Sequence, residues 1–329
     1  MSRPRTITTT FTMCAFATCA LGFTGATAAQ TYPTKPIRVI VPFAPGGPTD
    51  IWSRLIGAKL QETWGQPVVV ENRAGGTGQL GTGIVQSAPA DGYTLLFTSN
   101  SAHVVSPLLR EPRPFDSVRD FTPVTMVLKY PMYVLINPKV PAMNVAEYIS
   151  LAKSQPGKLN YSSVGTGSGG HLACELFNIA AGTDIVHVPY KGAAPAQAAL
   201  IAGETQMMCD SVGFSHGHVK AGRLRGLALF ASKRSAAAPE IPTLAESGVP
   251  QGEAYIWLGF LAPAGLPAPV LARLNNEVVR IMNLPEMRER VVTGGSEVVA
   301  NTPEQFAREM ASESEVWLRV IREKKIKAE

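Results

Sequence analysis

The stretch IRVIVPFAPGGPTD, residues 37–50, joins an apolar run to two adjacent glycines and a helix start. The apolar run has the pattern of a buried strand, and Ile51, Leu55 and Ala58 then return at helical spacing. A helix leaves its first amides without partners and carries about half a positive charge there, so a carboxylate or phosphate can dock without an arginine. This stretch predicts an α/β unit with an anion-binding turn. Its candidate ligand residues are Pro45, Gly46, Gly47, Pro48, Thr49 and Asp50.

A second glycine-rich turn, YSSVGTGSGGHL, occupies residues 161–172 and also opens a helical pattern. Thr166 and Ser168 add hydroxyl donors to its backbone amides. Taken alone, the turn is equally consistent with a flexible, serine-capped loop. Two such turns in one exported chain favour a two-walled cleft for an anionic ligand.

The first residues have the pattern of a secretory signal peptide. Arg3 and Arg5 precede an apolar run at residues 11–23 and then a set of small residues. The apolar run is shorter than the ~20 residues that a membrane span needs. We predict a signal peptide over residues 1–28, cleavage after Ala28 and a mature protein in the periplasm.

Chain length and net charge limit the number of domains and the kinds of partner that we expect. The chain has 329 residues and a formal net charge of +5, which becomes +3 without the two leader arginines. The mature length suggests two domains of ordinary size. Basic residues gather only in the C-terminal tail, so no nucleic-acid partner is expected.

Short apolar runs alternate with helical patterns along the chain. Such an alternation predicts an α/β protein whose sheets are largely parallel and covered on both faces. A threonine, proline and glutamine at residues 302–305 form the capping box of a final helix. We place domain 1 at residues 29–129 plus 258–329 and domain 2 at 130–257, with a hinge crossed near Lys129 and near Trp257. The runs that we interpret as strands are residues 37–41, 67–70, 93–97, 133–136, 185–188 and 226–230.

Two short motifs match known enzyme signatures, but we assign neither of the functions that they suggest. Residues 76–81, GTGQLG, match the dinucleotide fingerprint, but no acidic residue follows at the required spacing, so we interpret them as a surface turn into a small-residue helix. Residues 213–217, GFSHG, match the nucleophile elbow of α/β hydrolases, with Ser215 as the nucleophile. That fold needs a later histidine, and none follows His218. We therefore expect no catalytic residues.

For several residues that could form a site, the sequence is consistent with both a functional and a structural role. Tyr190 and Asp210 follow strands and are positioned to face a ligand, but Tyr190 is also suited to capping the core and Asp210 to capping a helix. Cys174 and Cys209 either form a disulfide or are separately buried. His216 and His218 lack a nearby third ligand, so neither a metal nor another cofactor is expected.

Six segments together carry a resemblance to one family. They are PFAPGGPTDIWSR (42–54), VVVENRAGGTGQLG (68–81), APADGYTLLFTSN (88–100), SSVGTGSGGHLACELF (162–177), VPYKGAAPA (188–196) and PTLAESGVP (242–250). In collinear order they resemble the Bug family, the periplasmic receptors of tripartite tricarboxylate transporters. The chain differs from the family's usual pattern at Ala74, Cys174 and Cys209, and the two cysteines bear on pocket size.

The resemblance implies a type II periplasmic binding-protein fold, in which two α/β domains close on a ligand. It implies a small organic carboxylate as ligand and a large and a small integral-membrane subunit as partners. A monomeric receptor is expected. The alternatives are a receptor that signals to a membrane protein, and an exported serine hydrolase. By position, the resemblance adds the following ligand residues to the first turn: Thr98, Ser99, Asn100, Ser163, Thr166, Gly167, Ser168, His171, Tyr190 and Asp210.

Overall fold

The computed structural model describes Met1, residues 32–249 and residues 254–327. The predicted signal peptide, apart from Met1, lies outside the described residues. Within the described ranges, no helix combines the length and the apolarity that a membrane crossing requires.

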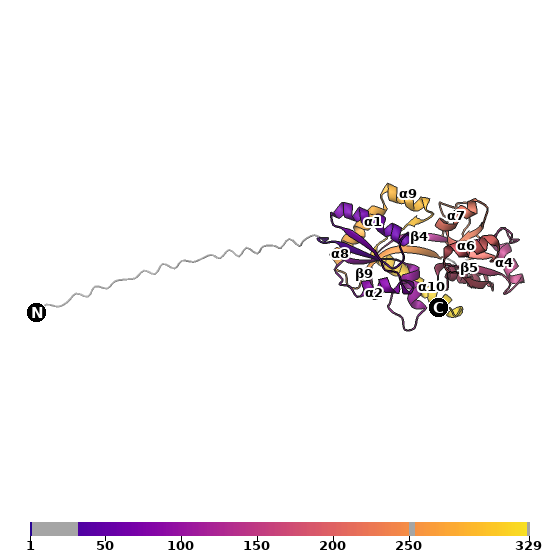
Figure 1. Ribbon diagram of the computed structural model, residues 1–329, viewed down its shortest axis with the longest axis horizontal. Coiled ribbons are helices and arrows are strands. Elements are labelled where there is room, and N and C mark those ends of the chain that lie inside the picture. Colours follow the sequence, from indigo (N-terminus) through magenta and orange to yellow (C-terminus); the bar gives the residue numbers. More distant parts are fainter. Residues whose placement is uncertain (2–31, 250–253, 328–329) are drawn as a thin grey trace. The chain divides into compact units, whose positions relative to one another are not determined.

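The first group of strands surrounds β1, which the turn at residues 42–47 connects to α1 (Figure 1). β1 pairs in parallel with β2 on one side and β3 on the other, and β9 then joins β3 and β4 in antiparallel fashion. A short β10 pairs with β4. The bounds are β1 Ile37–Val41, β2 Val68–Asn72, β3 Thr94–Ser99, β4 Phe121–Ile136, β9 Tyr255–Pro263 and β10 Glu297–Val298.

The second group shares β4 with the first. From Met132 onward, β4 leaves β9 and pairs with β7 and β8, both antiparallel. β5 then lies parallel to both β7 and β6. The sheet is therefore mixed, where the sequence analysis expected it to be largely parallel. The bounds are β5 Asn160–Ser163, β6 Val186–Pro189, β7 Met207–Ser211 and β8 Arg225–Leu229.

Side chains in the second half of β4 alternate between two cores because successive residues of a strand point to opposite faces. Met132, Val134 and Ile136 belong to a core that extends under both strand groups, whereas Tyr133 and Leu135 belong to a smaller core of the second group. All five are almost fully buried. β4 thus joins the two groups into one continuous packing unit.

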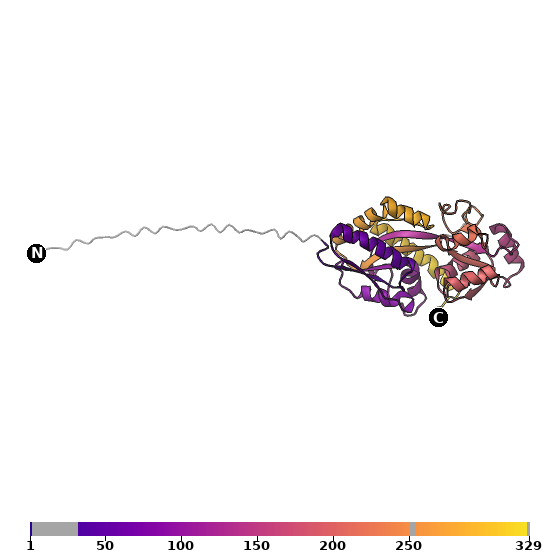
Figure 2. The ribbon, with the colours of Figure 1, turned by 45° about the horizontal axis from the view of Figure 1, so that its top comes forward.

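Helices cover both faces of each strand group (Figures 1 and 2). α1 and α8 pack on one face of the first group, and α2 and α10 lie on the other. α5 packs beside α10, while α6 and α7 cover the opposite face of the second group. The helices are α1 Pro48–Trp64, α2 Gln79–Gln86, α3 Ser106–Leu108, α4 Val145–Ser154, α5 Gly169–Ala181, α6 Ala193–Ala202, α7 Val212–Lys220, α8 Ala268–Met282, α9 Pro285–Thr293 and α10 Pro303–Glu323, with the short turns η1 Gly76–Gly78 and η2 Ser101–Val105.

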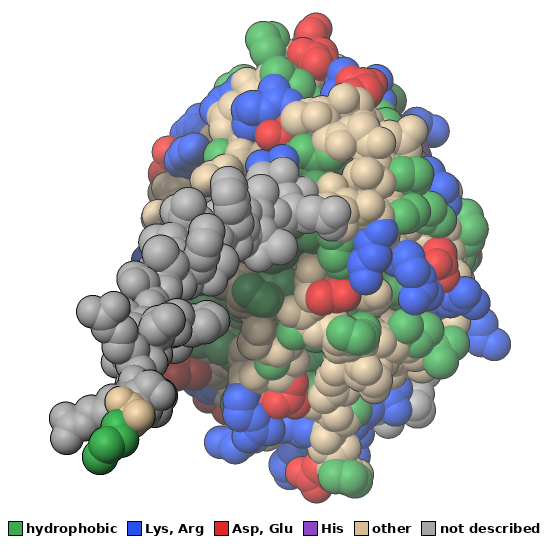
Figure 3. Space-filling view, turned by 90° about the vertical axis from the view of Figure 1, so that its left-hand side faces the viewer, with side chains coloured by type: hydrophobic (Ala, Val, Ile, Leu, Met, Phe, Trp, Pro, Cys, Tyr) green, Lys and Arg blue, Asp and Glu red, His purple; other side chains and the backbone are tan. Residues whose placement is uncertain are grey.

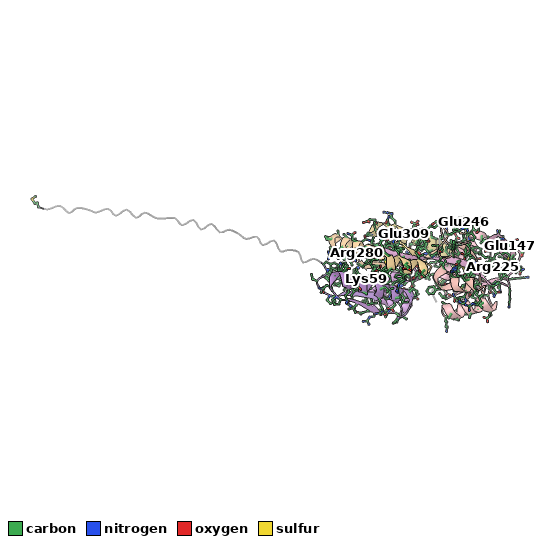
Figure 4. All side chains as sticks on the ribbon, turned by 90° about the horizontal axis from the view of Figure 1, so that it is seen from above. Lys59, Glu147, Arg225, Glu246, Arg280 and Glu309 are labelled. Carbon is green, nitrogen blue, oxygen red and sulfur yellow. A yellow bond between two sulfur atoms is a disulfide. The ribbon has the colours of Figure 1, made fainter. Side chains whose placement is uncertain are left out.

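Charged side chains tie helices together at the surface. Arg280 of α8 donates to Thr63 of α1 at 3.0 Å, and Lys59 of α1 lies 3.7 Å from Glu286 of α9. Lys59 and Arg280 are labelled in Figure 4 at the end of the molecule opposite Arg225. Basic and acidic side chains are interspersed over the visible part of the face in Figure 3.

The final helix begins as the sequence predicts. Thr302 caps α10, Pro303 is its first residue, and the capping box with Gln305 is present. Farther along α10, the half-buried Glu313 accepts hydrogen bonds from Asn100 at 2.6 Å and from the indoles of Trp257 and Trp317 at 2.7 and 2.8 Å. These three donors are neutral, and burial raises the pKa of Glu313. The carboxyl group anchors α10 to β3 and β9.

Cys174 of α5 and Cys209 of β7 form a disulfide, with their Cα atoms 5.6 Å apart. This settles the alternative that the sequence left open between a bridge and two separate buried thiols. Both residues are buried, so the bond fastens α5 to the central strand of the second group.

Replacing both cysteines by serine should lower the free energy of unfolding by about 2–4 kcal/mol, since the bridge restricts the unfolded chain. Urea unfolding followed by circular dichroism measures the loss. As a control, a reducing agent should lower the stability of the original protein to a similar degree and leave the double variant unchanged. Equal stability of the two proteins without reductant would show that the bridge contributes nothing.

Candidate ligand site

A cavity of about 400 Å³ lies where the second glycine turn meets the first group of strands. Four of the sequence-predicted ligand residues line it, namely Thr166, Gly167, Ser168 and Asp210. The full lining is Thr77, Ser101, Met132, residues 164–170, Ala193, Cys209, Asp210, Phe214 and Ile256.

The start of α5 supplies the polar end of this cavity. Ser168 is the N-cap, and its hydroxyl accepts the amide of His171 at 3.3 Å. Gly169 and Gly170 are the first two residues of the helix, so their amides have no acceptor within it. A Cβ on Gly170 would lie 2.5 Å from the carbonyl oxygen of Cys209, so only glycine lets the helix start sit this close to β7. The site therefore presents backbone donors at the positive end of a helix dipole.

His171 lies behind this turn and supports it, outside the cavity lining. Its Nδ1 accepts the amide of Gly167 at 2.9 Å, and its ring stacks on that of His187 at 3.8 Å between centroids. Ser163 hydrogen-bonds His187 Nε2 at 2.7 Å. Burial, and secondarily the neighbouring His187, lower the pKa of His171 to about 3. The neutral ring thus holds the glycine turn in shape.

Asp210 forms part of the cavity wall with a fixed set of donors. Its carboxyl oxygens accept the amide of Ser211 at 2.8 Å, the amide of Gln197 at 2.8 Å and the hydroxyl of Ser215 at 2.5 Å. Burial raises the pKa of Asp210 more strongly than these hydrogen bonds lower it. Ser211, not Asp210, is the N-cap of α7.

Ser215 does not have the surroundings of an elbow nucleophile. Its side chain is fully buried, donates to Asp210 and accepts from Gln197 at 2.8 Å. The neighbouring His216 instead bonds the hydroxyl of Tyr133 through Nδ1 at 2.7 Å. Among the described residues, no group of histidines, cysteines and carboxylates is arranged to hold a metal ion.

The first glycine turn is placed differently from the second. Gly47 caps α1 and Pro48 is its first residue, as the sequence indicates. However, Asp50 accepts the amide of Gly46 at 2.9 Å and pairs with Arg54 at 2.9 Å. The Asp50 carboxylate thus accepts the hydrogen bond of the Gly46 amide, which the sequence predicted to bind a ligand. Residues 45–50 are not among those that line the cavity.

The other predicted residues also lie outside the lining. Thr98, Ser99 and Asn100 are buried at the end of β3, where Asn100 donates to the carbonyl of Tyr255 at 2.7 Å. Tyr190 directs its hydroxyl toward Glu204 at 3.5 Å.

Another part of the cavity lining comes from two residues, Thr77 and Ser101, that were not predicted from the sequence. Thr77 and Ser101 belong to η1 and η2, which pack together so closely that a Cβ on Gly78 would lie 2.6 Å from that of Ala102. Thr77 has a positive φ of 57°, uncommon for a threonine. Residues 76–81 form the predicted surface turn into a small-residue helix, α2, and Thr77 of this turn also lines the cavity. The glycines of this segment indicated a turn, but no neighbouring residue in the sequence indicated that the turn lies beside Ser101.

Comparison with known proteins gives the family. Residues 53–326 match the family described as the tripartite tricarboxylate transporter family receptor. The chain is 36% identical to protein BugT of Bordetella pertussis over 303 residues, which is 92% of this chain and 93% of BugT. The chain belongs to this family of transporter receptors.

Solved structures agree with this assignment. MatC (Rpa3494) from Rhodopseudomonas palustris with bound malate is 32% identical, with a TM-score of 0.74 over 88% of this chain and 100% of that one. R. palustris Rpa4515 with adipate is 33% identical, with a TM-score of 0.77 over 90% and 99%. The predicted α/β fold of a periplasmic binding protein is thus confirmed.

The neutral His171 predicts a pH dependence of stability. Its folded pKa lies below its ordinary value of 6.5, so its contribution is complete above pH 6.5 and is lost as the pH falls toward 3. Between pH 6.5 and 5 the loss should reach about 2 kcal/mol. In His171→Asn this part of the loss should vanish, because an asparagine oxygen accepts the Gly167 amide without titrating. Urea unfolding at both pH values tests this; equal losses in the two proteins would refute it.

Proposed function

We propose that this chain is a periplasmic receptor that binds a small organic carboxylate at the start of α5 and delivers it to the transporter's large and small membrane subunits. It is exported by its leader and works as a monomer without catalysis. Thr77, Ser101, Thr166, Gly167, Ser168 and the amides of Gly169 and Gly170 contact the ligand in this proposal. The other predicted ligand residues stay predictions.

One observation carries the proposal. The amides of Gly169 and Gly170 open a helix of 13 residues at the edge of a cavity whose described lining contains no lysine, arginine or histidine. Such a site suits one carboxylate held by backbone donors and hydroxyls. The relatives solved with adipate and malate support the same ligand class.

We further propose that the two strand groups are the two domains, residues 29–129 plus 258–329 and residues 130–257, and that they close on the ligand. β4 changes partners between Pro131 and Met132, and β9 starts at Tyr255 directly opposite Pro131. The two crossing strands are therefore side by side where a hinge needs them.

Substituting Gly170 should test the ligand site directly. In Gly170→Ala the new Cβ meets the carbonyl of Cys209 and pushes the start of α5 out of place, so carboxylate affinity should fall at least about tenfold. Calorimetric titration and thermal shifts of periplasmic protein, refolded to remove bound ligand, measure this. A carboxylate at a hundredfold excess over Kd should raise the Tm of the original protein by roughly a few degrees.

Gly83→Ala is the matched control, since a Cβ at Gly83 of α2 meets nothing within 4 Å. It should bind as the original protein does. The proposal fails if no mono-, di-, tricarboxylate or aromatic acid binds. Turnover of nitrophenyl esters that Ser215→Ala abolishes would establish the hydrolase alternative instead.

A further inference from the structure

We infer that the ligand carries a single carboxylate on an apolar body, rather than two or three carboxylates. This inference rests on the proposed function and specifies the ligand class of the same cavity. It depends on three features: the charge of the wall, the exposed apolar side chains in it, and the way one of them is held.

The first feature is charge. Asp210 is the only ionisable side chain in the described lining, and neither of its protonation states supplies a positive charge. One carboxylate can lie at the positive end of α5, but a second would meet Asp210, the apolar wall or isolated neutral hydroxyls such as those of Thr77 and Ser101, and no cation in the described lining. A carboxylate that loses water without gaining a cation or several donors is strongly disfavoured.

The second feature is the apolar wall. Phe214 and Val164 remain 53% and 37% exposed, and both line the cavity together with Met132 and Ile256. Leaving large apolar side chains in water is unfavourable, and a ligand that covers them recovers this free energy. A hydrocarbon chain or ring is the ligand body that does so.

The third feature is the support of Phe214. Its ring stacks on Tyr130 at 6.4 Å between centroids, and the Tyr130 hydroxyl accepts the indole N–H of Trp52 at 3.0 Å. Tyr130 and Trp52 are buried. An exposed aromatic ring on an ordered base is suited to contact a ligand, because little side-chain entropy is lost when the ligand binds.

Hexanoate and adipate test the inference, because both have six carbons and differ by one carboxylate. Calorimetric titration of refolded periplasmic protein should give a Kd for hexanoate at least about tenfold lower than for adipate. Phe214→Ala should weaken hexanoate about tenfold. Val292→Ala, which trims a similarly exposed apolar side chain of α9 outside the cavity lining, should change neither affinity.

The other outcomes separate the two proposals. If adipate binds as tightly as hexanoate or more tightly, or if Phe214→Ala leaves hexanoate binding unchanged, the single-carboxylate inference is wrong and the receptor proposal stands. If neither these acids nor any other carboxylate binds, both proposals fail. Circular dichroism of each variant shows whether a lost affinity reflects lost folding.

Discussion

The register of β4 is the constraint on which the rest of the structure depends. From Met132 to Ile136 its side chains alternate between two buried cores, so a shift by one residue there would exchange these apolar contacts. The same register aligns Tyr133 with Asp210 and Pro131 with Tyr255. It therefore sets the position of Asp210 on β7 and of Ile256 on β9, which both line the cavity.

The polarity of the cavity comes from backbone groups that the fold holds in place. The disulfide and the contact of Gly170 with Cys209 seat α5 on β7, and the neutral His171 fixes the loop before it. Because these groups are preorganised, a carboxylate bound in the proposed site would require little rearrangement of donors. In this proposal the amides and hydroxyls recognise the carboxylate group, and side chains such as Phe214 discriminate between the bodies that carry it.

Features set by neighbouring residues could be predicted from the sequence. The strand at 37–41, the glycine cap of α1, the serine cap of α5 and the capping box at Thr302 each depend on a few adjacent residues. The length of β4, its antiparallel partners and the placement of Thr77 and Ser101 at the cavity depend on distant contacts. Asp50 shows that even local predictions can be incomplete. A spacing of four residues in a helix indicates its ion pair with Arg54, but nothing in the sequence indicates that it accepts the hydrogen bond of the Gly46 amide.

The C-terminal helix restricts how the proposed domains can move. Glu313 binds α10 to Asn100 and Trp257 of the first group, and Lys324, just beyond the helix, pairs with Glu175 of α5 at 3.2 Å. Separating Glu313 from Asn100 and Trp257 would leave its carboxyl group with only the Trp317 indole of the same helix and the Trp257 indole without its acceptor, which is costly. The bonds around Glu313 lie within the first strand group, so the proposed closing rotation leaves them intact. Contacts of α10 and the residues just beyond it with α5, including the Lys324–Glu175 pair, join the two groups, so we expect the movement to be smallest beside α10.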